Sequence, residues 1–201
     1  MYIIIEGMPG TGKTTIAREL SNRLNAMYMK SVLSDTKFGD ALKIVRKKDR
    51  STDLELMILS DLALDELRVV NYLKQGDLVR DKAITATLGH LYVHGYENDD
   101  QDVVDAIKKG YCQLEELGIQ PDIAIHLKRD KDKVFDNIKG KKDLSAIDKE
   151  LLDNYDVYEK QDIAIESYMK KIYGNRFMSL TCFSGSIDEM IDIILEGICH
   201  E

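Results

Sequence analysis

The chain has 201 residues, of which 44% are hydrophobic and 32% are charged, as is typical of a globular protein with one sizeable core. It has no apolar run near the roughly 18 residues of a membrane span, and its N-terminus lacks the basic start of a signal peptide, so we expect a cytoplasmic protein without a membrane partner. The net charge of −8 argues against a nucleic-acid partner, whose binding surface should be basic.

The first predicted elements are a strand over residues 2–5, a glycine-rich stretch and a helix. The stretch reads Gly7-Met8-Pro9-Gly10-Thr11-Gly12-Lys13-Thr14 and fits the phosphate-loop pattern G-x-x-x-x-G-K-[ST]. Ile16, Leu20 and Leu24 share a helical face, which predicts a helix from the loop to about residue 25. A strand, a glycine loop and a helix in this order predict a polyphosphate site rather than an ordinary turn.

Each fixed position of the loop has a chemical reason. Glycines let the backbone approach a ligand, and the N–H groups of residues 7–15 then point at a polyphosphate beside the positive end of the helix. Lys13 is expected to reach the β- and γ-phosphates, and the Thr14 hydroxyl is expected to ligate Mg²⁺. ATP and Mg²⁺ are therefore the expected cofactors. The expected nucleotide-binding residues in the loop are Gly7, Met8, Pro9, Gly10, Thr11, Gly12, Lys13, Thr14 and Thr15.

A short strand over residues 26–30 and two helices are predicted next. The helix over residues 41–48 ends in Arg46-Lys47-Lys48, which is either a solvated helix end or a phosphate clamp. Ser51-Thr52-x-x-Glu55 is a capping box that opens a long helix, and this helix stops at Gly76. Apolar residues occupy more than one face of it, which suits either a homodimer or a buried helix in a monomer.

Residues 77–82 form a short apolar run that ends in a carboxylate, which predicts a buried parallel strand. Ligands bind at the carboxyl edge of such sheets, so Asp81 is expected to hold Mg²⁺ or to orient the phosphate acceptor. The alternative is a helix cap or a surface aspartate. The helix over residues 83–96 carries His90 and His94 on one face, where a substrate pocket or plain surface explains them better than zinc.

The rest of the chain continues the alternation of helices and strands. A helix capped by Asn98-Asp99-Asp100 runs through Leu117, and a strand follows over residues 121–127 and a helix over 128–137. Lys139-Gly140-Lys141-Lys142-Asp143 is either a solvated loop or a mobile lid that closes over the transferred phosphoryl group. We expect one long helix over residues 148–173, a strand over 176–181, a loop at Ser184-Gly185-Ser186 and a last helix over 187–198.

This alternation predicts a parallel sheet covered on both faces within one α/β domain, residues 1–201, with the lid at about 138–148. Several stretches, in this order and spacing, resemble thymidylate kinases and their deoxynucleoside kinase relatives. They are Ile3-Ile4-Ile5-Glu6-Gly7, the phosphate loop, Val79-Arg80-Asp81-Lys82, Gly118-Ile119-Gln120-Pro121-Asp122, residues 139–142 and Ser184-Gly185-Ser186-Ile187.

The resemblance implies a P-loop NTPase of the nucleoside-monophosphate-kinase type with a five-stranded parallel sheet in the order 2-3-1-4-5. It implies transfer of the γ-phosphate of ATP to a nucleotide or nucleoside, most closely dTMP, and contact of Ser184 and Gly185 with the ATP base. Relatives of this type are commonly dimeric.

This chain departs from the thymidylate kinase pattern on the acceptor side. Pro9 stands where an acidic or polar residue usually touches the acceptor, and Asp81-Lys82 replaces Asp-Arg, with loss of a bidentate guanidinium. Leu59 aligns with an aromatic residue that stacks on thymine, and Ala63 aligns with an arginine that binds the acceptor phosphate. Candidates to replace that cation are Lys30, Arg68 and Arg80.

These residues together predict an Mg²⁺–ATP-dependent kinase. Lys13 would follow the charge onto the β–γ bridge, Asp81 would position the metal or the acceptor, and Lys82 would hold the acceptor. The cations expected to stabilise the transferred phosphoryl group are Lys139, Lys141 and Lys142. Three alternatives stay open: a kinase of a deoxynucleoside or another small hydroxylated metabolite, a nucleotide-binding switch, and a kinase fold that binds nucleotide without turnover.

Overall fold

The computed structural model of the chain describes residues 1–30, 41–42, 52–85, 101–182 and 186–199. Several sequence-based predictions lie outside these ranges: Arg46-Lys47-Lys48, Ser51 of the capping box, His90, His94, Asn98-Asp99-Asp100, Ser184 and Gly185. Within the described ranges, no helix is both long enough and apolar enough to cross a membrane.

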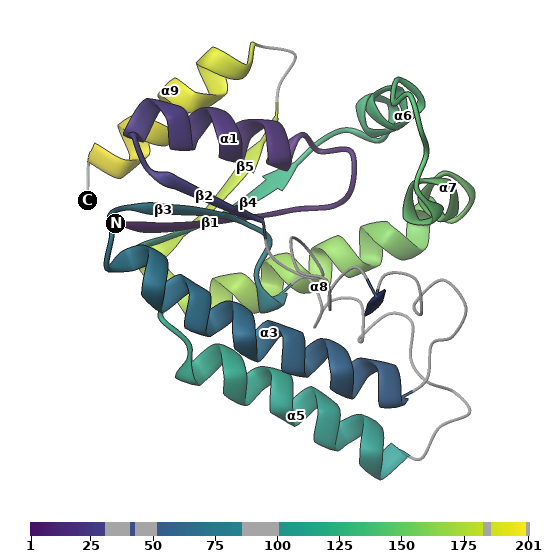
Figure 1. Cartoon of the computed structure of the whole chain (residues 1–201). Helices are drawn as coiled ribbons and strands as arrows, with labels where there is room; N and C mark the ends of the chain where they lie inside the picture. The colour runs from purple at the N-terminus through teal and green to yellow at the C-terminus, as the bar shows by residue number, and fades with distance from the viewer. Residues whose placement is uncertain (31–40, 43–51, 86–100, 183–185, 200–201) are drawn as a thin grey trace.

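Five parallel strands form the centre of the molecule (Figure 1). They are β1 (Tyr2–Glu6), β2 (Met27–Lys30), β3 (Leu78–Asp81), β4 (Ile123–Lys128) and β5 (Phe177–Thr181). The order across the sheet is β2-β3-β1-β4-β5 and every neighbouring pair is parallel, which confirms the predicted fold class and strand order. Every residue of β1 and β3 is buried, as expected for strands covered on both faces.

The two faces of the sheet carry separate helices, because alternate residues of a strand point to opposite sides. Ile3 and Ile5 pack with α1 (Lys13–Leu24) and α9 (Ile187–Cys199) on one face. Ile4 packs with α3 (Thr52–Leu73) and α8 (Tyr155–Tyr173) on the other, through Val69 and Ile165. The remaining long helix, α5 (Gln101–Leu117), lies against the outer side of α3 (Figure 1).

The single helix expected over residues 148–173 is wrong, because the structure has two helices there. The first, α7 (Ala146–Asp153), is separated from α8 by Asn154, whose backbone angles of φ −131° and ψ 48° are not helical. The Asn154 side-chain amide donates to the Glu150 carbonyl at 3.4 Å, a local bond by which asparagine competes with helix propagation. The break separates the direction of α7 from that of α8 (Figure 1).

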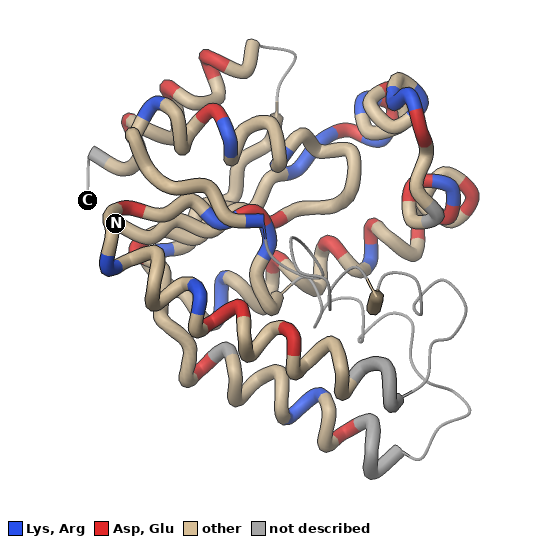
Figure 2. The backbone as a smooth tube through the Cα atoms, viewed as in Figure 1, with Lys and Arg blue, Asp and Glu red and all other residues tan. Residues whose placement is uncertain are grey.

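The helix expected over residues 128–137 is also shifted. The structure has β4 continuing to Lys128, and α6 (Lys131–Lys139) follows it with Asp130 at its N-cap. Lys139 therefore belongs to a helix rather than to the basic loop. Basic and acidic residues alternate along α6 and α7 (Figure 2).

Candidate functional site

The glycine loop leaves the end of β1 in a conformation that only glycine adopts easily. Gly7, Gly10 and Gly12 have φ angles of 144°, 87° and 93°. A Cβ on Gly7 would lie 2.5 Å from the Leu127 carbonyl oxygen, and one on Gly10 would lie 2.9 Å from Val134 Cγ1. The end of β4 and helix α6 therefore pack directly on the loop backbone.

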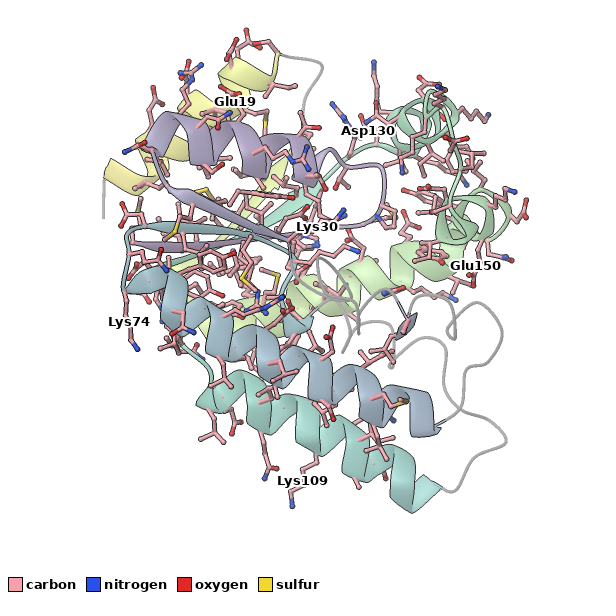
Figure 3. All side chains as sticks on the ribbon, in the orientation of Figure 1. Glu19, Lys30, Lys74, Lys109, Asp130 and Glu150 are labelled. Carbon is pink, nitrogen blue, oxygen red and sulfur yellow. The ribbon has the colours of Figure 1, made fainter. Side chains whose placement is uncertain are left out.

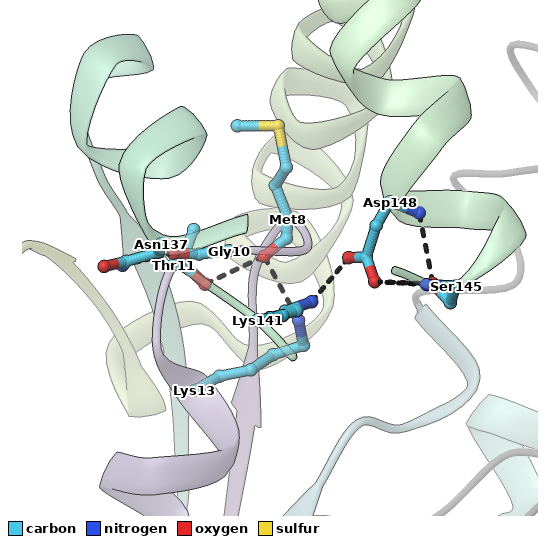
Figure 4. Close-up of polar contacts among 8 residues, drawn as sticks. All are labelled: Met8, Gly10, Thr11, Lys13, Asn137, Lys141, Ser145 and Asp148. Carbon is cyan, nitrogen blue, oxygen red and sulfur yellow. Dashed lines mark hydrogen bonds and ion pairs between the residues drawn. The ribbon is translucent and has the colours of Figure 1, made fainter. Parts of the chain in front are cut away.

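The loop is closed internally by the Met8 carbonyl oxygen (Figure 4). This oxygen accepts from the Thr11 amide at 3.3 Å, from the Thr11 hydroxyl at 2.9 Å and from Lys13 Nζ at 3.1 Å. Gly12 is the N-cap of α1 and gives no side-chain cap to its first amides. Burial, reinforced by repulsion from Lys82, lowers the pKa of Lys13 to about 8.

A carboxylate and a hydroxyl meet beneath the start of α1. The Thr14 hydroxyl donates to Asp81 Oδ2 at 2.6 Å, and the Tyr28 hydroxyl donates to the same oxygen at 3.2 Å. Burial raises the pKa of Tyr28 to about 12, so this hydroxyl stays protonated. Asp81 is fully buried and its Oδ1 has no hydrogen-bond partner among the described residues. Such an oxygen beside a hydroxyl suits a hard cation such as Mg²⁺.

A cleft of about 700 Å³ opens above this contact, at the carboxyl edge of the sheet. Among the predicted site residues it brings together residues 9–15, Lys82 and Lys141, whereas Gly7, Met8 and Asp81 lie beneath its surface. Lys30, at the end of β2 on the same edge (Figure 3), also lines it. The other lining residues are Ile16, Arg129, Asn137, Ser145, Ile147, Asp148, Cys182, Ser186, Ile187 and Met190.

Only one of the three predicted lid lysines lines the cleft. Lys141 forms an ion pair with Asp148, which also accepts from the Ser145 amide and hydroxyl in the capping box that opens α7 (Figure 4). Burial opposes ionisation of Asp148, but the hydrogen bonds from Lys141 and Ser145 outweigh it and lower the pKa. Lys139 instead lies 5.6 Å above the Phe135 ring, and Lys142 is exposed outside the cleft.

The acceptor-side alignment made from the sequence does not match the packing. Leu59 packs in the cluster between α3 and α5, where its Cδ2 lies 2.8 Å from the Cβ position of Gly110, so it does not face the cleft. Ala63 is exposed. Arg80 is buried in a pair with Glu66 at 2.6 Å and bonds the Tyr2 hydroxyl, so it lies in the core rather than in the cleft.

Sequence reasoning missed three residues at the site. Glu6 is fully buried, and its Oε1 accepts from the Ala83 amide at 2.6 Å and the Thr85 hydroxyl at 2.7 Å, which fixes the chain as it leaves β3. Burial raises the pKa of Glu6. The available signal was a carboxylate that ends an apolar strand directly before the glycine loop.

The other two missed residues come from the segment after β4. Asn137 on α6 donates from Nδ2 to the Gly10 carbonyl at 2.8 Å and so ties the helix to the tip of the loop. Arg129, directly after β4, lines the cleft near Gly12. The position of Arg129 at the carboxyl end of a strand was the signal, by the same reasoning that identified Asp81.

Comparisons with known proteins agree with this architecture. Two curated proteins named "Probable thymidylate kinase", from Methanococcus maripaludis strains C7 and C6, are each 24% identical over 204 residues, which cover 98% of this chain and 94% of the relative. The solved thymidylate kinase from Candida albicans superposes with a TM-score of 0.77 at 16% identity, covering 98% of this chain and 90% of that one.

A second group of similar structures consists of deoxynucleoside kinases. Deoxyadenosine kinase from M. mycoides with bound dCTP has a TM-score of 0.69 at 21% identity, and the match covers 100% of both chains. At these identities the likeness is one of fold. Residues 3–157 also match the sequence family described as an AAA domain. Because that match covers well over half of the chain and includes the phosphate loop, this protein belongs to the AAA domain family, with a P-loop kinase fold like that of thymidylate and deoxynucleoside kinases.

Proposed function

We propose that this protein is an Mg²⁺–ATP-dependent kinase that transfers the γ-phosphate of ATP to a nucleotide or nucleoside. The observation that carries the proposal is the buried contact between Thr14 and Asp81, with Asp81 Oδ1 unpartnered among the described residues, beside the Lys13 ammonium. A cation site, a phosphate loop and a buried lysine in one cleft suit phosphoryl transfer, which needs positioning and charge rather than a covalent protein intermediate.

Each residue has a stated role in this proposal. The amides of residues 7–15 hold the phosphates of ATP, and Thr14 and Asp81 hold Mg²⁺, which neutralises charge on the β- and γ-phosphates when bound. Lys13 exchanges the Met8 carbonyl for the phosphates. The Lys141 ammonium stabilises the transferred group, and Lys139 and Lys142 add positive charge along the lid.

A thymidylate-kinase-like reaction, dTMP to dTDP, is the leading proposal for the acceptor. Lys30 and Lys82 line the cleft beside the Asp81 end of β3, and two ammonium groups suit an acceptor that already carries a phosphate. The relatives from Methanococcus maripaludis carry the same activity in their names.

A deoxynucleoside acceptor is the second candidate. The fold of the M. mycoides deoxyadenosine kinase matches the chain over its whole length. In addition, Arg80, a candidate cation for an acceptor phosphate, is paired with Glu66 in the core rather than in the cleft.

A panel of acceptors with Mg²⁺–ATP tests the proposal. ADP formation is measured with deoxynucleoside monophosphates, deoxynucleosides and other small hydroxylated metabolites, and we expect the largest kcat/KM for dTMP. Lys13→Ala should lower kcat by orders of magnitude while the circular dichroism spectrum is unchanged. Turnover retained in that variant, or no acceptor-dependent ADP formation in the wild type, would contradict the kinase assignment.

Three features stay predictions from the sequence: a homodimer, a cytoplasmic location, and one domain over residues 1–201 with a lid at about 138–148. The contact of Ser184 and Gly185 with the ATP base is likewise a proposal, and ATP analogues with altered bases test it.

A further inference from the structure

Arg129 is a cation of the cleft to which the sequence assigned no role. It follows β4 directly and precedes Asp130, the N-cap of α6 (Figure 3). A Cβ built on Gly12 would lie 3.6 Å from Arg129 Nη1, so the guanidinium lies against the N-cap of α1. It is also close enough to Cys182, after β5, to act on the pKa of that thiol.

The guanidinium of Arg129 lacks the counter-ion that neighbouring cations have. Lys128 pairs with Glu166 and Lys141 pairs with Asp148. Arg129 makes no hydrogen bond or ion pair with any residue that the structure describes, and its Nε is buried without a partner. A buried donor of a charged group left unpaired is unfavourable unless a ligand satisfies it.

The position of the Arg129 charge makes its lack of a counter-ion more unfavourable. The N-terminus of α1 already carries a partial positive charge, and Gly12 provides no side chain to cap it. An anion that binds both would therefore stabilise a guanidinium placed beside it. A phosphate at the helix N-terminus meets this requirement, because it accepts from the amides and from the fork of the arginine together.

We infer that Arg129 binds the donor nucleotide through its α-phosphate, at the end of the phosphate loop formed by Gly12. This inference rests on the proposed function for the identity of the donor. Cys182, Ile187 and Met190 also line the cleft, and their apolar side chains suit the nucleoside part. Arg129 lies near both Gly12 of the phosphate loop and Cys182. The α-phosphate joins the nucleoside to the rest of the polyphosphate, so it is the group that a cation between these two parts would bind.

Titration of the full-length protein with four ligands tests the inference. Affinities for Mg²⁺–ATP, ADP, AMP and inorganic tripolyphosphate are measured by calorimetry for the wild type, Arg129→Ala, Arg129→Lys and Lys131→Ala. Lys131 is the matched control, because it is also a cation of this segment but lies over the Tyr155 ring at 4.6 Å, outside the cleft.

We expect Arg129→Ala to lower the affinity for all four ligands by a similar factor, about tenfold to a hundredfold, as for the loss of a hydrogen bond to a charged group. Arg129→Lys should recover only part of the affinity, because an ammonium lacks the planar fork. Lys131→Ala should bind like the wild type. Equal thermal midpoints of the ligand-free proteins show that the fold is intact, and Arg129→Gln replaces Arg129→Ala if that variant is unstable.

Three results would overturn the inference. Equal affinities of the wild type and Arg129→Ala would remove any role in binding, as would a wild type that binds none of the ligands. Lower affinities for ATP, ADP and AMP in Arg129→Ala, with an unchanged affinity for tripolyphosphate, would assign Arg129 to binding of the base instead. The kinase proposal fails separately, through absent acceptor turnover in a wild type that binds ATP.

Discussion

Lys13 is a cation of the phosphate loop that is buried away from water. It is 6% exposed, its Nζ donates to the Met8 carbonyl, and its pKa is lowered to about 8 by burial and by Lys82. A lowered lysine pKa means that the folded state favours the neutral amine. The stability that this amine gives is fully present above the ordinary pKa of 10.5 and is lost as the pH falls through about 8.

A bound polyphosphate should reverse this shift, because its negative charge favours the ammonium form. We therefore expect ATP to bind with uptake of about half a proton at pH 8, and its affinity to fall as the pH rises through the Lys13 pKa of about 8. Calorimetry in buffers of different ionisation enthalpy measures the uptake. Lys13→Arg is the control, since arginine stays protonated and should abolish the uptake even if it weakens binding. Affinity that is constant between pH 7 and 9.5 would contradict this role.

Two substitutions test the charge of the Asp81 carboxylate separately from the hydrogen bonds that it accepts. Asp81→Asn keeps the size of the side chain but removes the charge, so the affinity for Mg²⁺–ATP should fall about tenfold or more while that for metal-free ATP changes little. Tyr28→Phe removes the other donor to Asp81 Oδ2 and should leave the metal dependence unchanged. A titration of activity against free Mg²⁺ compares the two variants. Equal Mg²⁺ requirements in Asp81→Asn and the wild type would exclude Asp81 from the metal site.

At the scale of elements, α7 is held at its start by one capping box. Ser145 Oγ accepts a hydrogen bond from the Asp148 amide at 3.1 Å, and the Asp148 carboxylate accepts one from the Ser145 amide at 3.0 Å. Ser145→Ala should lower the free energy of unfolding by about 1 kcal/mol, the usual loss for an N-cap. Ser60→Ala is the control, because the exposed Ser60 hydroxyl bonds the Leu56 carbonyl inside α3 and caps nothing. Urea denaturation measures both. Equal losses in the two variants would show that the box contributes no stability.

The sequence predicted elements well where local chemistry decides them. Apolar runs and the glycine pattern predicted β1, the loop and α1 to within a residue or two. The division of α7 from α8 was missed, because the residues on both sides of Asn154 have ordinary helix propensity and the non-helical angles of one residue decide it. Lys139 was expected in a loop, since Gly140 alone does not reveal that α6 extends up to it.

The candidate site was predictable on the donor side and less so on the acceptor side. The spacing of Lys13 and Thr14 is fixed within one turn of chain, so the motif determines their placement. Leu59, Arg80 and Arg129 depend on contacts with residues distant in sequence. Glu66, which lies on another element, decides that the Arg80 guanidinium is in the core, and no local pattern in the sequence reveals this pair.

At the scale of the whole molecule, α3 leaves an apolar row uncovered. Leu64 and Leu67 are 54% and 61% exposed, and Leu56 and Met57 are exposed on the same helix. We expect the wild type to sediment as a dimer of the 22.9 kDa chain, and Leu64→Lys with Leu67→Lys to sediment as a monomer. Ile163→Lys, at an exposed apolar position on α8, is the control and should not change the mass. A wild type that is monomeric at micromolar concentrations would contradict the predicted homodimer.

The central place of β1 also constrains the order in which the chain acquires its fold during synthesis. The first of the five strands along the chain is the middle strand of the sheet, and its partners lie at residues 78–81 and 123–128. The Tyr2 amide can donate to the Asp122 carboxylate, and Gly7 can pack against the Leu127 carbonyl, only once residues 122–127 have been synthesised. A nascent chain released before residue 127 therefore has no phosphate loop in its final form, and its N-terminal isoleucines lack one neighbouring strand. We therefore expect ATP to bind only once the chain through Leu127 has left the ribosome.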